Sequence, residues 1–144
     1  MLMLRTVLFI FLLTTSLSSP ASLHPDKSSS EEKNLFINVD EIGIISIGRD
    51  TVSSDELARY LQERLFKSYM GTGKMYNKIL LIKPEGDVPE MVMEVVLTEI
   101  KTGQQRALKE LCLQKHKDFF ENISQRQQEK LKKQFPVLFQ TNYS

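Results

Sequence analysis

The pattern of apolar and polar residues predicts strands and helices in the order strand, strand, helix, strand, helix. Apolar side chains alternate with other residues over positions 35–39 and return at positions 44–47. Alternation is typical of a strand with one buried face. Glu41, Ile42 and Gly43 interrupt it, so the two segments predict a hairpin joined by a tight turn.

A first helix is expected after this hairpin. Leu57, Tyr60, Leu61 and Leu65 recur at helical spacing, while polar residues lie between them. Such a stripe favours an amphipathic helix packed on a sheet, ending near Tyr69. The helix start is predicted by a second pattern, because Ser53 and Glu56 have the spacing of a capping box.

Residues 78–100 combine a strand, a turn and a second helix. Four aliphatic residues at 79–82, bounded by Pro84, predict a strand buried on both faces. Asp87 and Glu90 have capping-box spacing, and Pro89 suits a first helical turn. The apolar residues expected to face the sheet or widen that stripe are Met91, Val92, Met93, Val95, Val96, Leu97 and Ile100.

The C-terminal residues predict a helical extension. Ala107, Leu108, Leu111 and Cys112 keep helical spacing, and Ser124 with Gln127 can cap a later helix that carries Ile123, Leu131 and Phe135. The apolar residues 135–139 are expected to pack back on the domain. The chain as a whole is therefore predicted to be α+β: a small sheet, made of the hairpin plus a further strand, with two helices packed on one face and a helical C-terminal extension.

Composition narrows the function classes. The chain has 144 residues, of which 41% are hydrophobic and 26% charged, and its net charge is +1. This is a globular composition without the bias that a nucleic-acid ligand requires. The single cysteine, Cys112, excludes an intramolecular disulfide and is expected to be a small buried apolar residue.

The N-terminal residues 1–22 contain an apolar block between Arg5 and a run of small and hydroxylated residues. Its members are Val7, Leu8, Phe9, Ile10, Phe11, Leu12 and Leu13. The block fits a cleaved signal peptide. It also fits a membrane anchor near the short end of the roughly 17 to 25 residues needed. Either interpretation exports the rest of the chain, and residues 23–34 are expected to form a flexible linker.

Motifs for catalysis and cofactors are weak. Residues 71–74 resemble part of a phosphate loop, but Ser68 and Met75 stand where such a loop needs glycine and Ser or Thr. His24 and His116 lack metal-ligand spacing. No Ser or Cys has a base at a recognisable spacing. We therefore expect a non-enzymatic protein without a metal or cofactor.

Two stretches, residues 37–65 and 78–101, together resemble the periplasmic domain of the ExbD/TolR biopolymer-transport family. In that family a hairpin with an acidic-Gly turn precedes a Val-Ser-x-x-Glu-Leu helix start, and an aliphatic strand later precedes a Val-Pro pair and a Val/Met-rich helix. The matching residues are Asp40, Gly43, Val52, Ser53, Glu56, Leu57, Ile79, Leu80, Leu81, Ile82, Asp87, Val88, Pro89, Val92, Val95 and Val96. The resemblance assigns residues 35–103 to this domain and leaves 104–144 as an extension.

The resemblance implies a role as well as a fold. Residues 1–22 would be a single-pass anchor in the bacterial inner membrane, with the C-terminal domain in the periplasm. Partners would be a polytopic ExbB- or TolQ-like protein, a TonB- or TolA-like driven protein and a second copy of this chain. The chain would then be an accessory subunit of a proton-motive-force-driven complex that supports transport across the outer membrane. The alternative is a secreted or periplasmic non-enzymatic adaptor released by signal-peptide cleavage.

Two departures from the family pattern accompany the match. Family members carry a proton-carrying aspartate in the membrane helix, but residues 1–25 hold no Asp or Glu, so none can be assigned. Either the sequence starts inside its gene, which we expect, or the proton site is lost. Relatives also close the sheet with a last strand, which we expect to be missing or displaced here.

Overall fold

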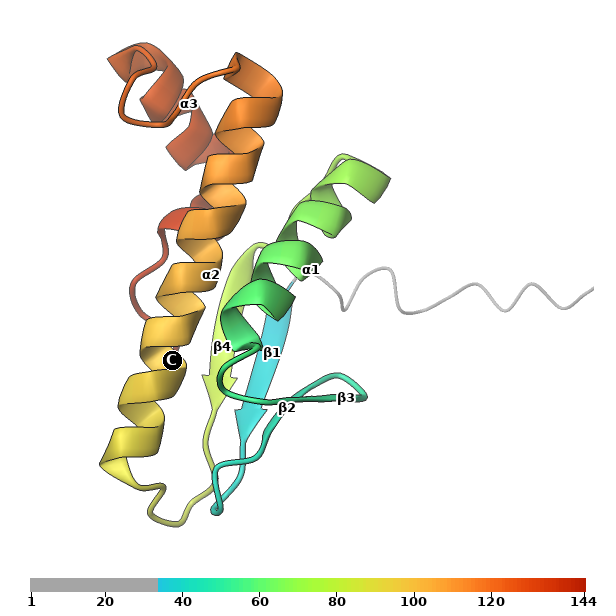
Figure 1. Ribbon diagram of the computed structural model, residues 1–144, viewed down its shortest axis with the longest axis vertical. Helices are drawn as coiled ribbons and strands as arrows, with labels where there is room; N and C mark the ends of the chain where they lie inside the picture. The colour runs from blue at the N-terminus through green and yellow to red at the C-terminus, as the bar shows by residue number, and fades with distance from the viewer. Residues whose placement is uncertain (1–33) are drawn as a thin grey trace, which may run out of the picture.

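Four strands form one mixed sheet in the computed structural model, which describes residues 34–144 (Figure 1). They are β1 (Asn34–Val39), β2 (Ile45–Ile47), β3 (Asp50–Val52) and β4 (Lys78–Ile82), in the order β3-β2-β1-β4. Neighbours pair antiparallel except β1 and β4, which are parallel. The predicted α+β class is confirmed.

The sheet contains one strand more than the sequence pattern predicted. Ile47 pairs with Asp50 across a two-residue turn, in which Gly48 adopts a φ of +61°. A two-residue hairpin turn needs positive φ at such a position, which glycine supplies without strain. β3 was not predicted from the sequence, because it has only three residues and buries only one side chain, that of Val52.

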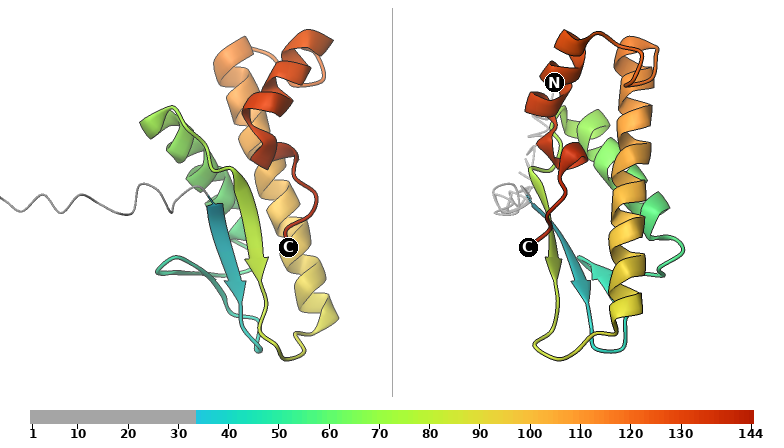
Figure 2. Two further views of the ribbon diagram at one scale, coloured as in Figure 1. Left: turned by 180° about the vertical axis from the view of Figure 1, so that it is seen from behind. Right: turned by 90° about the vertical axis from the view of Figure 1, so that its left-hand side faces the viewer.

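Helices α1 (Leu57–Thr72) and α2 (Glu90–His116) cover the same face of the sheet (Figure 2). Because β1 and β4 are parallel, the chain must cross over between them, and α1 lies in this connection. The core between the layers consists of fully buried aliphatic residues from strands and helices. These include Ile37, Ile45, Leu57, Leu61, Leu65, Ile79, Val96 and Ile100.

Both predicted capping boxes at these helices are wrong. Glu56 is the N-cap of α1 and makes no side-chain cap hydrogen bond. Its N–H instead donates to the Ser53 carbonyl, which forms a turn and delays the helix start. In α2 the N-cap is Pro89, again without a side-chain cap, so Asp87 lies two residues before the capping position. α1 also continues three residues beyond the predicted end, to Thr72.

The expectation that β4 is buried on both faces is also wrong. Ile79 is fully buried, but Ile82 is 45% exposed, and Leu80 and Leu81 are half-buried. No helix of the described chain covers the second face of the sheet, which is the near face in the left view of Figure 2. The strand is therefore buried mainly on the side that faces α1 and α2.

The C-terminal extension is continuous with the domain, because α2 is a single helix of 27 residues. At 1.5 Å per residue it is about 40 Å long and passes through the predicted boundary at residue 103. α3 (Gln125–Gln134) and the 3₁₀ helix η2 (Pro136–Phe139) then fold back along it (Figure 1). The predicted capping box of Ser124 and Gln127 is present.

The apolar tail packs back on the domain, as predicted. Phe135, Val137 and Leu138 are buried, and the Phe135 ring meets Tyr69 of α1 edge to face at 5.2 Å between centroids. Cys112 is fully buried, as expected. The extension therefore adds its own apolar layer to the core.

The predicted anchor, with Val7 to Leu13, and nearly all of the predicted linker lie outside the described residues. Among residues 34–144, no helix combines the length and the apolar character that a membrane crossing requires.

Candidate interaction surface

The two stretches that carry the family resemblance meet at one end of the molecule. The β1–β2 turn, the β4–α2 loop and the first turns of α2 all lie at the lower end in Figure 1. Gly43 in the turn has a φ of +85°, and a Cβ built there would lie 3.1 Å from Val92 Cγ1. Glycine is therefore favoured at position 43 both by its backbone angle and by the closeness of α2.

Asp40 holds this turn in shape. Its Oδ1 accepts hydrogen bonds from the N–H groups of Ile42 at 3.0 Å and Ile44 at 2.8 Å. The neighbouring Glu41 side chain reaches the β4–α2 loop, where a Cβ on Gly86 would lie 3.1 Å from Glu41 Oε1. The turn and the loop thus form one contiguous structure.

Large apolar side chains are exposed at this end. Ile42 and Met91 are each 79% exposed, and three further aliphatic residues are about half exposed. We call the set the distal surface, because it lies at the opposite end of β1 from Asn34, where the chain enters the sheet. Its residues are Ile42, Ile44, Ile82, Met91 and Val95. Exposed apolar side chains rimmed by polar residues mark protein-interaction sites.

Carboxylates surround the distal surface. The same turn, loop and helix start expose six acidic residues and one basic residue, Lys83. The acidic residues are Asp40, Glu41, Glu85, Asp87, Glu90 and Glu94. The surface therefore suits a partner with apolar and cationic side chains.

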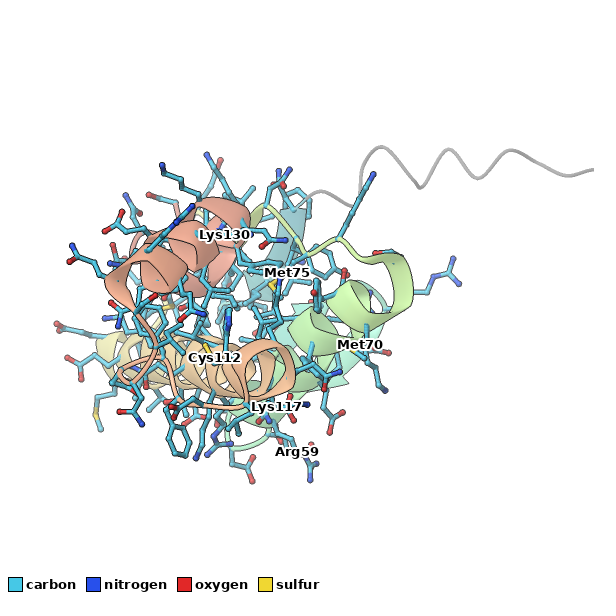
Figure 3. The ribbon with its side chains drawn as sticks, turned by 90° about the horizontal axis from the view of Figure 1, so that it is seen from above. Arg59, Met70, Met75, Cys112, Lys117 and Lys130 are labelled. Carbon is cyan, nitrogen blue, oxygen red and sulfur yellow. The ribbon has the colours of Figure 1, made fainter. Side chains whose placement is uncertain are left out.

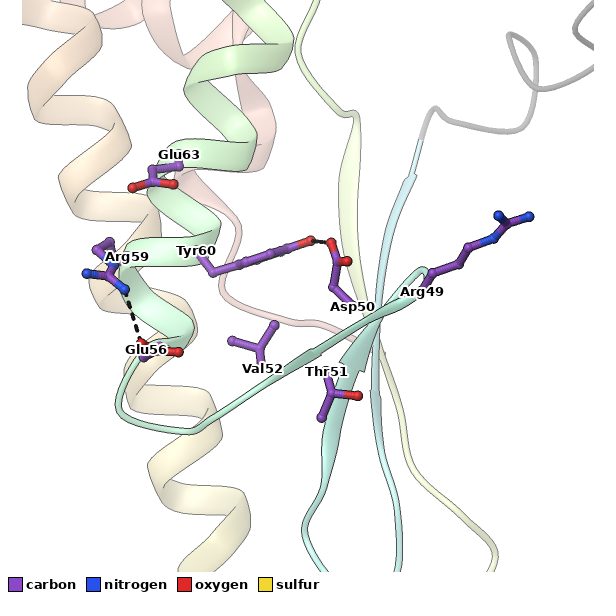
Figure 4. A pocket seen from close by; sticks show the side chains of 8 residues that line it. All are labelled: Arg49, Asp50, Thr51, Val52, Glu56, Arg59, Tyr60 and Glu63. Carbon is purple, nitrogen blue, oxygen red and sulfur yellow. Dashed lines mark hydrogen bonds and ion pairs between the residues drawn. The ribbon is translucent and has the colours of Figure 1, made fainter.

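A cavity of about 390 Å³ between β3 and α1 is the best candidate for chemistry (Figure 4). In it the Tyr60 hydroxyl donates to Asp50 Oδ2 at 2.6 Å. Burial and this hydrogen bond raise the pKa of Tyr60 to about 12. A phenol with that pKa stays protonated at neutral pH and is no general base. The pair joins β3 to α1.

The remaining motif candidates have structural roles. Residues 71–74 close α1: Gly73, at a φ of +71°, donates its N–H to the Tyr69 carbonyl at 2.8 Å. This is a glycine C-cap and not a phosphate loop. His116 Nδ1 lies 3.4 Å from Gln127 Nε2. Within residues 34–144 no group of three His, Cys, Asp or Glu side chains could hold a metal ion.

A second polar site, missed by sequence reasoning, holds the C-terminal tail. Gln104 of α2 is only 2% exposed. Its Nε2 donates to the Val137 carbonyl at 2.6 Å and to the Gln140 carbonyl at 3.1 Å, while its Oε1 accepts from the Tyr143 hydroxyl at 2.6 Å. All polar atoms of this side chain therefore have partners.

The tail in turn occupies the outer edge of β4. Gln140 Oε1 accepts from the Ile79 N–H at 2.8 Å, and Gln140 Nε2 donates to the Ile79 carbonyl at 2.7 Å. The Leu81 N–H donates to the Tyr143 carbonyl at 2.7 Å. In the part of the chain that the structure describes, no strand follows α2. The side chain of Gln140 takes the place of the neighbouring peptide that a last strand would provide.

Comparison of the chain with protein-family models, with curated proteins and with solved structures gives no match. The likeness to the ExbD/TolR family therefore depends on the sequence motifs, and the function drawn from it is a proposal.

Proposed function

We propose that this chain is a membrane-anchored, non-enzymatic subunit of a proton-motive-force-driven complex of the ExbB–ExbD or TolQ–TolR type. The observation that supports this is the meeting of the two motif-bearing stretches at the distal surface. Three residues that match the family in sequence lie close together here. Asp40 holds the turn that contains Gly43, and Gly43 in turn lies against Val92 of α2.

In this proposal the distal surface docks a TonB- or TolA-like driven protein. Its apolar side chains would supply the buried contact, and the surrounding carboxylates would select cationic partner residues. The chain enters the described fold at Asn34, the start of β1, and the distal surface lies at the other end of this strand. A tether at one end and a docking surface at the other would let the subunit transmit movement between its partners.

The first test locates the true N-terminus of the full chain. We expect the native protein to stay in the membrane fraction, with the apolar residues 7–13 retained in the intact mass, and to co-purify with a polytopic partner. A mass that shows cleavage near Ser22, with release from the membrane, would contradict the anchor and favour the adaptor.

The second test addresses the distal surface. The double substitution Ile42→Lys with Met91→Lys should weaken association with the driven protein by about tenfold or more, since central apolar contacts carry most interface energy. Met70→Lys is the matched control, because Met70 is 52% exposed but lies near the end of α1. Equal binding by all variants, with unchanged thermal stability, would overturn the assignment of this surface.

A further inference from the structure

Charge is distributed unevenly along the described chain. Residues 104–144 carry eight Lys and Arg side chains against four Asp and Glu, a side-chain charge of +4. Residues 34–103 carry eight against eleven, a charge of −3. The overall charge of +1 conceals this division. The extension is the basic part of the molecule.

The basic residues of α3 form a stripe. Arg126, Lys130 and Lys133 are spaced i, i+4 and i+7, which places them on one helix face. All three are exposed, whereas Leu131 is buried on the opposite face. Within residues 34–144 none of the three is in an ion pair, because the ion pair found joins Arg59 to Glu56. These cations are therefore available to an external anion.

The stripe lies at the other end of the molecule from the distal surface. Figure 3 looks onto this end, where Lys130 of α3 and Lys117, just after α2, are labelled. β1 and β4 both run from this side toward the distal surface (Figure 1). β1 begins about halfway between the two ends of the molecule (Figure 1), so a chain held by the residues before Asn34 can turn its basic end toward the membrane.

We propose that the α3 stripe binds the phosphate headgroups of anionic lipids in the membrane that holds the chain. This inference rests on the proposed anchor. Charge complementarity supports anionic lipid as the ligand of the stripe. Each Lys or Arg close to an anionic bilayer strengthens the binding of a protein to that bilayer about fivefold. The attraction acts within a Debye length, about 8 Å at physiological salt. Contact would orient the domain with its distal surface pointing away from the bilayer.

The test uses the full chain in nanodiscs of phosphatidylcholine, with or without phosphatidylglycerol. A lipid with a gadolinium-bearing headgroup broadens the NMR signals of amides that lie near the membrane surface. At about 50 mM salt, where screening is weak, we expect the α3 amides to broaden in discs with phosphatidylglycerol. They should broaden at least about threefold less in phosphatidylcholine discs, or at about 1 M salt.

A matched pair of charge reversals tests the stripe itself. Lys130→Glu with Lys133→Glu should abolish the lipid-dependent broadening. Lys83→Glu with Lys101→Glu changes the charge equally at exposed sites on other elements and should leave it intact. Equal broadening in both lipids, or an equal loss in both variants, would overturn the inference. Perturbation by soluble polyphosphate but not by phosphatidylglycerol would also overturn it.

Failure of the anchor gives a different result. A chain that leaves the discs at about 1 M salt is not anchored, because salt screens headgroup attraction but does not release an apolar span. Such a chain should still bind phosphatidylglycerol discs at about 50 mM salt if the stripe binds lipid. If such a chain does not bind these discs, the proposal that the α3 stripe binds anionic lipid is overturned as well.

Discussion

The Tyr143 hydroxyl donates to Gln104 Oε1 at 2.6 Å, although 39 positions separate the two residues in the chain. Through the same side chain, Gln104 also binds the carbonyls of Val137 and Gln140. Because Gln140 pairs with Ile79, α2, the tail and β4 are joined in one polar network. The extension is therefore fastened to the sheet as well as to the helices.

Replacing Gln104 by leucine should destabilise the protein. Leucine is similar in size but leaves the Val137 carbonyl and the Tyr143 hydroxyl without this partner in a buried site, a cost of about 2 to 4 kcal/mol. Urea unfolding followed by circular dichroism measures the change. Gln105→Leu is the control, since Gln105 is exposed, and should change stability by less than about 0.5 kcal/mol. Equal effects at both positions would contradict the network's role.

Gly103→Ala should destabilise the contact between α1 and α2. A Cβ at Gly103 would lie 2.8 Å from Leu61 Cβ and 2.9 Å from the Ala58 carbonyl oxygen, so the helices must separate. We expect a net loss of about 1 to 3 kcal/mol, despite the better helix propensity of alanine. Gly71→Ala, in α1 with no atom within 4 Å of the new Cβ, should instead stabilise by about 0.5 to 1 kcal/mol. Thermal unfolding of both variants decides the matter.

The hydrogen bond from Tyr60 to Asp50 predicts a loss of stability at alkaline pH. The folded-state pKa of Tyr60, about 12, lies above its ordinary value of 10.0, so the folded protein holds this proton more tightly. The contribution is complete below about pH 10 and is lost as the pH rises toward about 12. Tyr60→Phe should unfold at lower urea concentration than the parent at about pH 8, and the difference should shrink at about pH 11. A constant difference would exclude this linkage.

Cys112 should be unreactive while the protein is folded. Its thiol is fully buried, and burial, reinforced by the nearby Glu121 carboxylate, raises the pKa of the thiol. Thiolate is the reactive form, so labelling by a disulfide reagent should follow the unfolding rate and become fast in urea. Rapid labelling under native conditions would show that the α2–α3 layer opens locally.

The main strands and helices could be predicted because their apolar residues repeat over several turns or alternations. Leu57, Leu61 and Leu65, together with Ala58, form the buried face of α1. The start of α1 could not be predicted in the same way, because the Ser-x-x-Glu spacing at Ser53 also fits the turn that the structure adopts. β3 has a single buried residue, Val52, so its sequence shows no alternation of apolar and polar residues from which a strand could be predicted.

The tail site could not be predicted for a different reason. A lone glutamine on an amphipathic helix usually faces water, and no residue near Gln104 in the sequence indicates that its side chain is buried. Its partners, Val137 and Tyr143, follow more than 30 positions later. The division of charge was visible in the sequence, but its meaning depends on α3 and the distal surface lying at opposite ends of the fold (Figure 1).

The Gln140 amide has a consequence for how copies of this chain can assemble. A sheet with two free edges can add strands on both sides, and such head-to-tail addition generates open filaments. Here the β4 edge is filled by Gln140 and Tyr143, so in the described sheet only the β3 edge remains for another strand. Two copies joined edge to edge through β3 would leave no template for a third. An assembly built by pairing the strands of this described sheet would therefore stop at a closed pair.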